Sequence, residues 1–193
     1  MSVPAAVRAM AAPRRSAAPW AIFLGASVVL AGLLLLVPDP AWYPWALTVL
    51  TAIGAGWIAV VDVRTRTLPN RLVAPFAAAS ALQLVAVAVG RAAWSVLLWG
   101  VLAAAIAGAL YLLMGLAGWV GFGDVKFAPA LALAAAAAAG TAAVWLTPIA
   151  IVLGGVWTLI RRAAGDSERR QAHGPALAAG AIVLMVAGVL WPV

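Results

Sequence analysis

Two of the five acidic residues in this 193-residue chain lie where a long uncharged hydrophobic stretch meets a short polar segment. Asp62 follows the stretch that begins at Ala41, and Asp124 follows the stretch that begins at Ala92. A carboxylate beside hydrocarbon is costly, so an acid kept there indicates a functional site. If two such groups come close together, one of them keeps a proton, because like charges disfavour each other. The pair can then act as base and acid together: the ionised member activates a water, and the protonated member donates to the developing oxyanion.

The residues beside the two aspartates suit such a site. Gly121 and Gly123 are expected to adopt backbone conformations closed to other residues and to let an extended substrate approach the backbone. Lys126 either holds nearby negative charge or anchors the membrane interface. We assign these three residues to substrate binding. In the other segment, Pro69 stops the loop, and Asn70 is expected to cap the helix that follows.

The composition shows what kind of molecule must position these residues. The chain is 67% hydrophobic and 9% charged, with a mean hydropathy of +1.12, which is typical of an integral membrane protein. Strand alternation is absent and the apolar runs are longer than barrel strands, so we predict an all-α, polytopic helical bundle. The uncharged stretches cover residues 20–37, 41–61, 72–90, 92–123, 127–160 and 175–193.

Most of these stretches have the length of one transmembrane helix, which needs about 20 residues. The stretch 127–160 is too long for one helix, and Gly140 and Thr141 near its middle predict a hairpin of two short helices. We therefore predict seven transmembrane helices, or six if this stretch forms one crossing. Residues 1–19 form a basic cytoplasmic tail, and residues 20–193 form a single membrane domain.

The basic residues predict the orientation of the bundle. With seven crossings every cluster falls on one side, which the positive-inside rule makes the cytoplasmic side. Both aspartates then lie at that side, Asp62 at the end of the second helix and Asp124 at the end of the fourth. Small residues at 54–56 and 103–109 would let these two helices pack closely. The clusters contain Arg8, Arg14 and Arg15; Arg64, Arg66 and Arg71; Lys126; and Arg161, Arg162, Arg169 and Arg170.

Several other kinds of site are disfavoured. The chain has no cysteine, which excludes disulfides, thiolate catalysis and cysteine-ligated metals. With one histidine, His173, we expect no metal or organic cofactor, and we interpret His173 as polar loop surface. The net charge of +7 is scattered over short loops and does not line one face, so we expect membrane lipids as partners and no nucleic acid.

The segments around the aspartates resemble the two signature motifs of the type IV prepilin peptidase family, membrane aspartic proteases of the GxGD kind. The first motif runs from Asp62 through Leu68-Pro69-Asn70, and the second is Gly121-Phe122-Gly123-Asp124-Val125-Lys126. Their order, separation and expected membrane side agree with the family. A third segment, residues 174–181, is similar to the stretch that opens the family's last helix. The two motifs together are a more specific signal than a GxGD sequence alone.

The resemblance implies that Asp62 and Asp124 are the catalytic pair of an aspartic endopeptidase. Such an enzyme removes the short basic leader from prepilins or pilin-like precursors at the cytoplasmic face of the inner membrane. Bifunctional members also methylate the new N-terminus and carry an extra region with paired cysteines. This chain has neither that insert nor any cysteine, so it resembles the short, peptidase-only form that serves pilus or related secretion systems.

Two other interpretations remain open from the residues. In the first, Asp62 and Asp124 bind or relay a cation in a small transporter, although such acids usually lie near the bilayer midplane. In the second, the chain is a non-enzymatic subunit of a membrane assembly. That interpretation predicts that asparagine is tolerated at both positions. The oligomeric state and the particular pilin are left undetermined.

Overall fold

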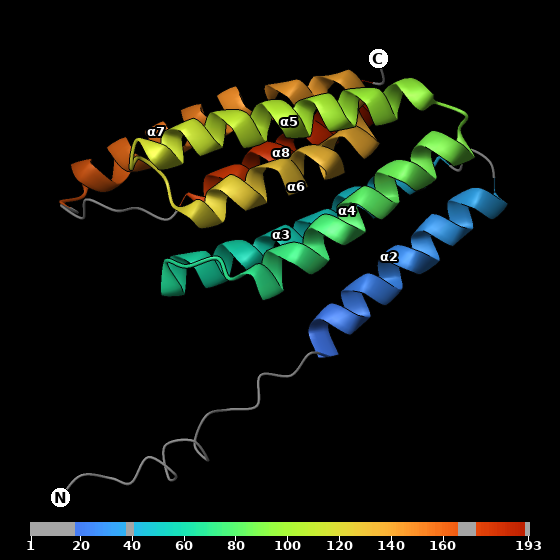
Figure 1. Ribbon diagram of the computed structural model, residues 1–193, viewed down its shortest axis with the longest axis horizontal. Helices are drawn as coiled ribbons and strands as arrows, with labels where there is room; N and C mark the ends of the chain where they lie inside the picture. The colour runs from blue at the N-terminus through green and yellow to red at the C-terminus, as the bar shows by residue number, and fades with distance from the viewer. Residues whose placement is uncertain (1–17, 38–40, 166–172, 192–193) are drawn as a thin grey trace, which may run out of the picture.

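The computed structural model describes residues 18–37, 41–165 and 173–191, and over these ranges the chain is helical without strands (Figure 1). The predicted all-α bundle is therefore confirmed. All but the last two residues of the predicted tail 1–19 lie outside the described residues, as do Arg169 and Arg170. The elements are α2 (Ala18–Leu36), α3 (Tyr43–Thr65), α4 (Asn70–Gly90), α5 (Trp94–Leu116), α6 (Phe122–Ala139), the 3-10 helix η1 (Gly140–Trp145), α7 (Leu146–Ala163) and α8 (Gly174–Leu190).

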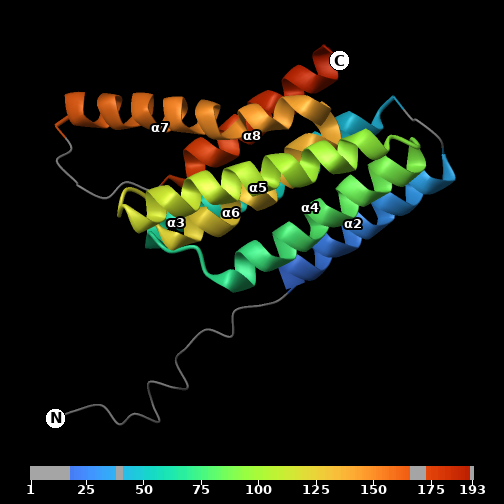
Figure 2. The ribbon, with the colours of Figure 1, turned by 45° about the horizontal axis from the view of Figure 1, so that its top comes forward.

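Five helical stretches in the described part are long and apolar enough to cross a membrane, and α8 is apolar but shorter. One of the five is the 42-residue stretch Phe122–Ala163, which contains α6, η1 and α7. Gly140 has a φ of 54° at the end of α6, a backbone conformation that glycine adopts without steric cost. The chain reverses here, and α7 returns antiparallel to α6 in both ribbon views (Figure 2). The hairpin predicted around Gly140 is therefore present.

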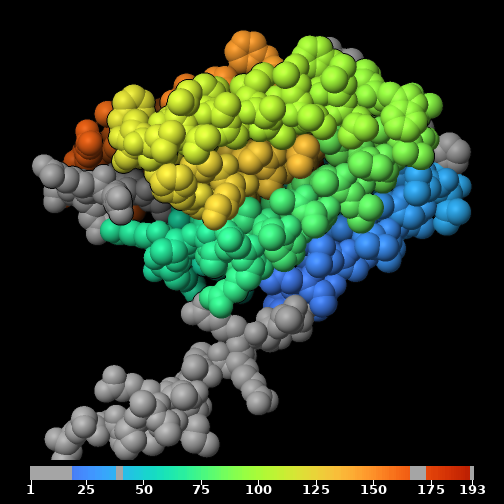
Figure 3. Space-filling model, viewed as in Figure 1, coloured from blue at the N-terminus to red at the C-terminus, as the bar shows by residue number. Residues whose placement is uncertain are grey.

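Helix α6 lies at the centre of the bundle. It packs against α5, α4 and α8, and in the space-filling view it shows only as a narrow band between α4 and α5 (Figure 3). Alanine gives this helix a thin profile, so its neighbours approach closely. Ala134, Ala135 and Ala136 are almost fully buried, while large apolar side chains on the outer helices are exposed, as lipid contact requires. The alanine run thus forms the core of the bundle.

The structure corrects the predicted place of Asp124. Helix α5 ends at Leu116, the turn passes through Gly118 at a φ of 76°, and a new helix begins at Phe122. Asp124 therefore lies in the first turn of α6 and not at the end of the fourth helix. An acidic side chain there can hydrogen-bond the backbone N–H groups that the first turn of a helix leaves unpaired. The apolar stretch 92–123 concealed this turn because its residues are uncharged.

The close packing of the second helix on the fourth, which the small residues would allow, does not occur among the described residues. Helix α3 contacts α8 extensively and α6 and α2 to a smaller extent, but it has no contact with α5. Gly54 of α3 instead makes room for α2 and α4: a Cβ there would lie 2.6 Å from a ring carbon of Phe23 and 3.0 Å from one of Phe76. Helix α3, which carries Asp62, therefore contacts α6, which carries Asp124.

Candidate functional site

Asp62 lies in the last turn of α3 with only 5% of its surface exposed. The helix ends because Arg66 adopts a left-handed conformation at a φ of 53° and its N–H donates to the Asp62 carbonyl oxygen at 2.7 Å. The carboxyl group of Asp62 points towards the start of α8, where the Gly174 N–H donates to Oδ2 at 2.9 Å. A Cβ on Gly174 would lie 2.7 Å from that oxygen, so only glycine leaves room for this contact.

Asp124 is similarly buried, with 6% of its surface exposed. The Gly121 N–H donates to its Oδ2 at 3.2 Å, so the side chain caps the helix in which it lies. Its Oδ1 is buried and has no hydrogen-bond partner among the described residues. Buried polar atoms are rarely left unpaired, and each exception needs an explanation such as a catalytic role.

The two carboxyl groups come from α3 and α6, which contact each other. The connections that follow α3 and precede α6 lie at the same end of the bundle, as does the start of α8 (Figures 1 and 2). The described basic residues Arg64, Arg71 and Lys126 lie close to these connections in the sequence. The structure thus places both predicted site aspartates at one end of the bundle, on helices that contact each other.

The two motifs are joined by direct contacts. Leu68, which is 8% exposed, packs on Gly123, where a Cβ would lie 2.5 Å from the Leu68 Cβ and 3.2 Å from its backbone nitrogen. The Lys126 ammonium group donates to Asn70 Oδ1 at 2.8 Å. The loop after Asp62 is therefore held against the first turn of α6 by one apolar and one polar contact.

These contacts revise the expected roles of three residues. Gly121 has a φ of −77°, and Gly123 is helical without a positive φ, so neither requires a conformation restricted to glycine. Gly123 is needed for space, because Leu68 occupies the position of a side chain. Asn70 begins α4 and does not cap it, because its side chain accepts from Lys126. Substrate binding by Gly121, Gly123 and Lys126 stays a prediction.

His173 is part of the site, contrary to its interpretation as polar loop surface. It is partly buried and immediately precedes α8, and its Nε2 lies 2.8 Å from the hydroxyl oxygen of Tyr111 on α5. Burial lowers the pKa of His173 from its usual value, so the imidazole is neutral at pH 7. The hydroxyl of Tyr111 is also within the electrostatic influence of Asp124. The sequence offered no signal for this pair, since 62 residues separate its members.

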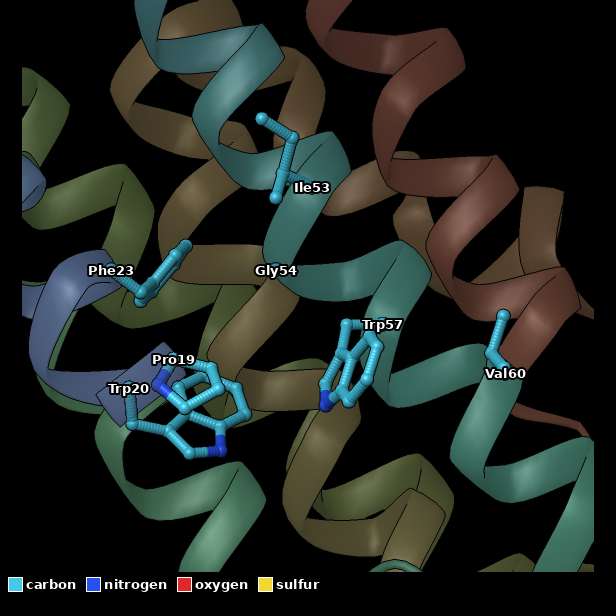
Figure 4. A pocket seen from close by; sticks show the side chains of 7 residues that line it. All are labelled: Pro19, Trp20, Phe23, Ile53, Gly54, Trp57 and Val60. Atoms are coloured by element: carbon cyan, nitrogen blue, oxygen red, sulfur yellow. The ribbon is translucent and has the colours of Figure 1, made fainter. Parts of the chain in front are cut away.

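Two apolar recesses open beside α3. One, with a volume of about 270 Å³, lies between α2 and α3, and neither aspartate lines it (Figure 4). Its lining comprises Pro19, Trp20, Phe23, Ile53, Gly54, Trp57 and Val60. The other, of about 260 Å³, is lined by Ala59, Val60, Val63, Arg64 and Pro175, which are neighbours of Asp62 and Gly174 in sequence. The second recess therefore adjoins the site, whereas the first carries no group that could do chemistry.

Within the described ranges, no three histidine or acidic side chains gather closely enough to hold a metal ion. The chemistry available at this end of the bundle is that of two buried carboxyl groups, a tyrosine hydroxyl and a neutral imidazole.

Comparison with known proteins gave one match. A family model described as the type IV leader peptidase family matches residues 49–159, which include both aspartates and end before His173. No curated protein matched the chain, and no solved structure matched it either.

Proposed function

Since the chain belongs to the type IV leader peptidase family, we propose that it is an aspartic endopeptidase that removes the leader peptide from prepilin or pilin-like precursors. Asp62 and Asp124 are its catalytic pair. The observation that supports this proposal is that each of the two motifs places one buried carboxyl group at the same end of the bundle, on helices α3 and α6, which contact each other. A leader peptidase needs a group that activates water and a group that protonates the carbonyl oxygen, and this pair supplies both.

In the proposed mechanism the two carboxyl groups share one proton, because two neighbouring carboxylates in a poorly solvated site do not both ionise readily. The ionised carboxylate removes a proton from a water, whose oxygen attacks the carbonyl carbon of the scissile peptide bond. The protonated carboxyl group donates its proton to the carbonyl oxygen, which gives a tetrahedral diol. Collapse of the diol breaks the C–N bond: the protonated carboxyl group gives its proton to the leaving amine, and one diol hydroxyl gives its proton to the ionised carboxylate as the new carbonyl group forms. The pair again holds one proton.

The hydrogen bonds of the site suit this cycle. Each carboxyl group is oriented by a backbone N–H, Asp62 through Gly174 and Asp124 through Gly121, so neither depends on a mobile side chain for its position. Oδ1 of Asp124 is left available to the water or the substrate carbonyl. A preorganised pair of this kind loses little energy in reorienting during the reaction.

The proposed location is the inner membrane, with the site at the cytoplasmic side. The described basic residues support this orientation: Arg64, Arg66 and Arg71 follow Asp62, and Lys126 follows Asp124, whereas Arg91 lies in the connection at the opposite end. Cytoplasmic loops carry an excess of lysine and arginine. The leader of a precursor inserted in the same membrane would then lie on the same side as the pair.

The test uses the full chain in lipid vesicles with a panel of leader-bearing pilin precursors, and mass spectrometry detects the products. We expect the wild type to release a leader from at least one precursor, and Asp62→Asn and Asp124→Asn to release it at least about 100-fold more slowly. Tyr43→Phe, a change at a buried tyrosine that bonds Gln83, is the control and should cut like the wild type. A cation flux through wild-type vesicles that both asparagine variants lose, without any cleavage, would support a transporter instead.

A further inference from the structure

Beyond the catalytic pair, we propose that Tyr111 and His173 are positioning residues that hold the Gly174 amide against Asp62. The inference rests on the proposed function for its kinetic consequence, but the contact that it concerns exists independently of any substrate. His173 lies outside the residues that the family model matches, and Tyr111 lies on α5, which does not contact α3. The proposal gives both residues a role in the site.

The peptide bond between His173 and Gly174 is fixed at both of its polar atoms. Its N–H donates to Asp62 Oδ2 at 2.9 Å, and its carbonyl oxygen accepts from the N–H groups of Ala176 and Leu177 at 3.1 and 3.2 Å. The orientation of this single peptide plane therefore decides whether Asp62 receives its hydrogen bond. A group that anchors His173 controls that orientation directly.

The His173 ring is anchored on two sides. Its Nε2 lies 2.8 Å from the Tyr111 hydroxyl oxygen, and the two ring centroids are 5.6 Å apart. On the other side the ring packs on Gly154 of α7, where a Cβ would lie 2.5 Å from Cε1 and 2.8 Å from Nδ1. Helices α5 and α7 thus fix His173, which immediately precedes α8. Through His173 they also fix the Gly174 N–H, which donates to Asp62 of α3.

Tyr111 is fully buried, so its hydroxyl group needs the partner that His173 provides. The titratable groups that gather here are Asp62, Asp124, Tyr111 and His173. With a neutral imidazole, one ring nitrogen donates and the other accepts, so the contact with the tyrosine hydroxyl needs no charge. The contact between Tyr111 and His173 therefore holds the residue whose peptide bond supplies the hydrogen bond to Asp62.

The chain allows the Gly174 amide to be observed alone. It contains one histidine, so labelling with ¹³C-carbonyl histidine and ¹⁵N-glycine gives a single NMR signal, that of the His173–Gly174 peptide bond. We expect Tyr111→Phe to shift this signal in the same direction as Asp62→Asn and to speed its hydrogen exchange about tenfold, as loss of a hydrogen bond implies. The matched control Tyr43→Phe removes another buried tyrosine hydroxyl and should change neither quantity.

The kinetic arm measures leader cleavage by Tyr111→Phe, His173→Phe and His173→Gln. We expect kcat to fall about 10- to 100-fold in the two phenylalanine variants with KM nearly unchanged, because a misplaced catalytic group slows the chemical step. His173→Gln should recover part of the loss, since its amide can still bond the tyrosine. The acidic limb of the pH–rate profile should also move to higher pH, because Asp62 loses a hydrogen bond that favours its charged form.

The outcomes separate this inference from the proposed function. An unchanged Gly174 signal in Tyr111→Phe overturns the inference, whether or not the wild type cleaves a precursor. If the wild type cleaves, a changed signal with an unchanged kcat in Tyr111→Phe overturns it too. A change in KM alone overturns it as well, because it indicates substrate contact. If the wild type cuts no precursor but the signal moves as expected, the positioning contact stands and the proposed function fails. Should the phenylalanine variants not fold, His173→Gln decides: a kcat equal to that of the wild type overturns the inference, and a lower kcat with unchanged KM supports it.

Discussion

Asp62 and Asp124 each accept one backbone N–H, and each donor lies at the start of a helix. The partial positive charge of a helix N-terminus favours a carboxylate placed there. Asp124 lies in the first turn of α6 and bonds the residue before that helix, whereas Asp62 lies in the last turn of α3 and bonds the first residue of α8. One carboxyl group is thus positioned locally and the other by tertiary contact, so they should respond differently to changes elsewhere in the bundle.

The pH dependence of cleavage follows from the shared proton. Only the singly protonated pair has both a base and an acid, so kcat/KM should fall when low pH protonates both groups and when high pH ionises both. We expect a bell-shaped profile whose two limbs belong to the pair. His173 should contribute no limb near neutral pH, because burial lowers its pKa below the usual value. A profile that rises to a plateau with one limb only would contradict the shared proton.

Gly123 is predicted to be required for space. Gly123→Ala places a Cβ against Leu68, so the loop after Asp62 must move, at a cost of about 1–3 kcal/mol for overpacking. We expect a lower Tm and slower cleavage. Gly56→Ala is the control, because nothing lies within 4 Å of the new Cβ and alanine favours a helix. Equal behaviour of the two variants would show that Leu68 does not pack on this glycine.

At the scale of elements, the loop before α4 and the first turn of α6 form one unit. The chain has no cysteine, so Asn70→Cys with Lys126→Cys should be cross-linked by a short bifunctional thiol reagent without background. Asn70→Cys with Ser95→Cys is the control, since Ser95 lies at the start of α5, at the other end of the bundle. Failure of the first pair to cross-link, when both thiols react with a maleimide, would contradict the contact between the two motifs.

The elements also show what the sequence reveals and what it conceals. Hydropathy locates the helices to within a few residues, because each crossing must bury a continuous apolar surface. It does not locate the turn between α5 and α6, because Gly118 and its neighbours are as uncharged as the helices beside them. The contact between Tyr111 and His173 depends on how α5 and α8 pack, and no local pattern encodes that. The aspartates were found because charge is rare in this chain.

At the scale of the whole molecule, seven α-helices in the described part place the polar segments of the site at one end and Arg91 at the other. This arrangement depends on the reversal at Gly140, which brings the chain back along α7 to the end where α8 begins (Figure 2). Gly174 can therefore donate its N–H to Asp62.

The orientation in the membrane can be measured with single cysteines. Thr67→Cys marks the loop beside the site, and Ser95→Cys marks the opposite end; both positions are exposed. In intact cells we expect an impermeant maleimide to label Ser95→Cys from outside, and to label Thr67→Cys only after the membrane is opened. The reverse pattern would place the site outside the cell and would contradict cleavage at the cytoplasmic face.

The most direct test of the central claim is a double-mutant cycle on the leader cleavage rate with Asp62→Asn, Asp124→Asn and the combined variant. Groups that act as one unit give losses that do not multiply. We expect each single change to lower the rate by about 10²–10⁴-fold and the combined variant to be no slower than the slower single one. A single variant that keeps more than about a tenth of the wild-type rate would contradict the aspartyl pair, as would losses that multiply in the combined variant.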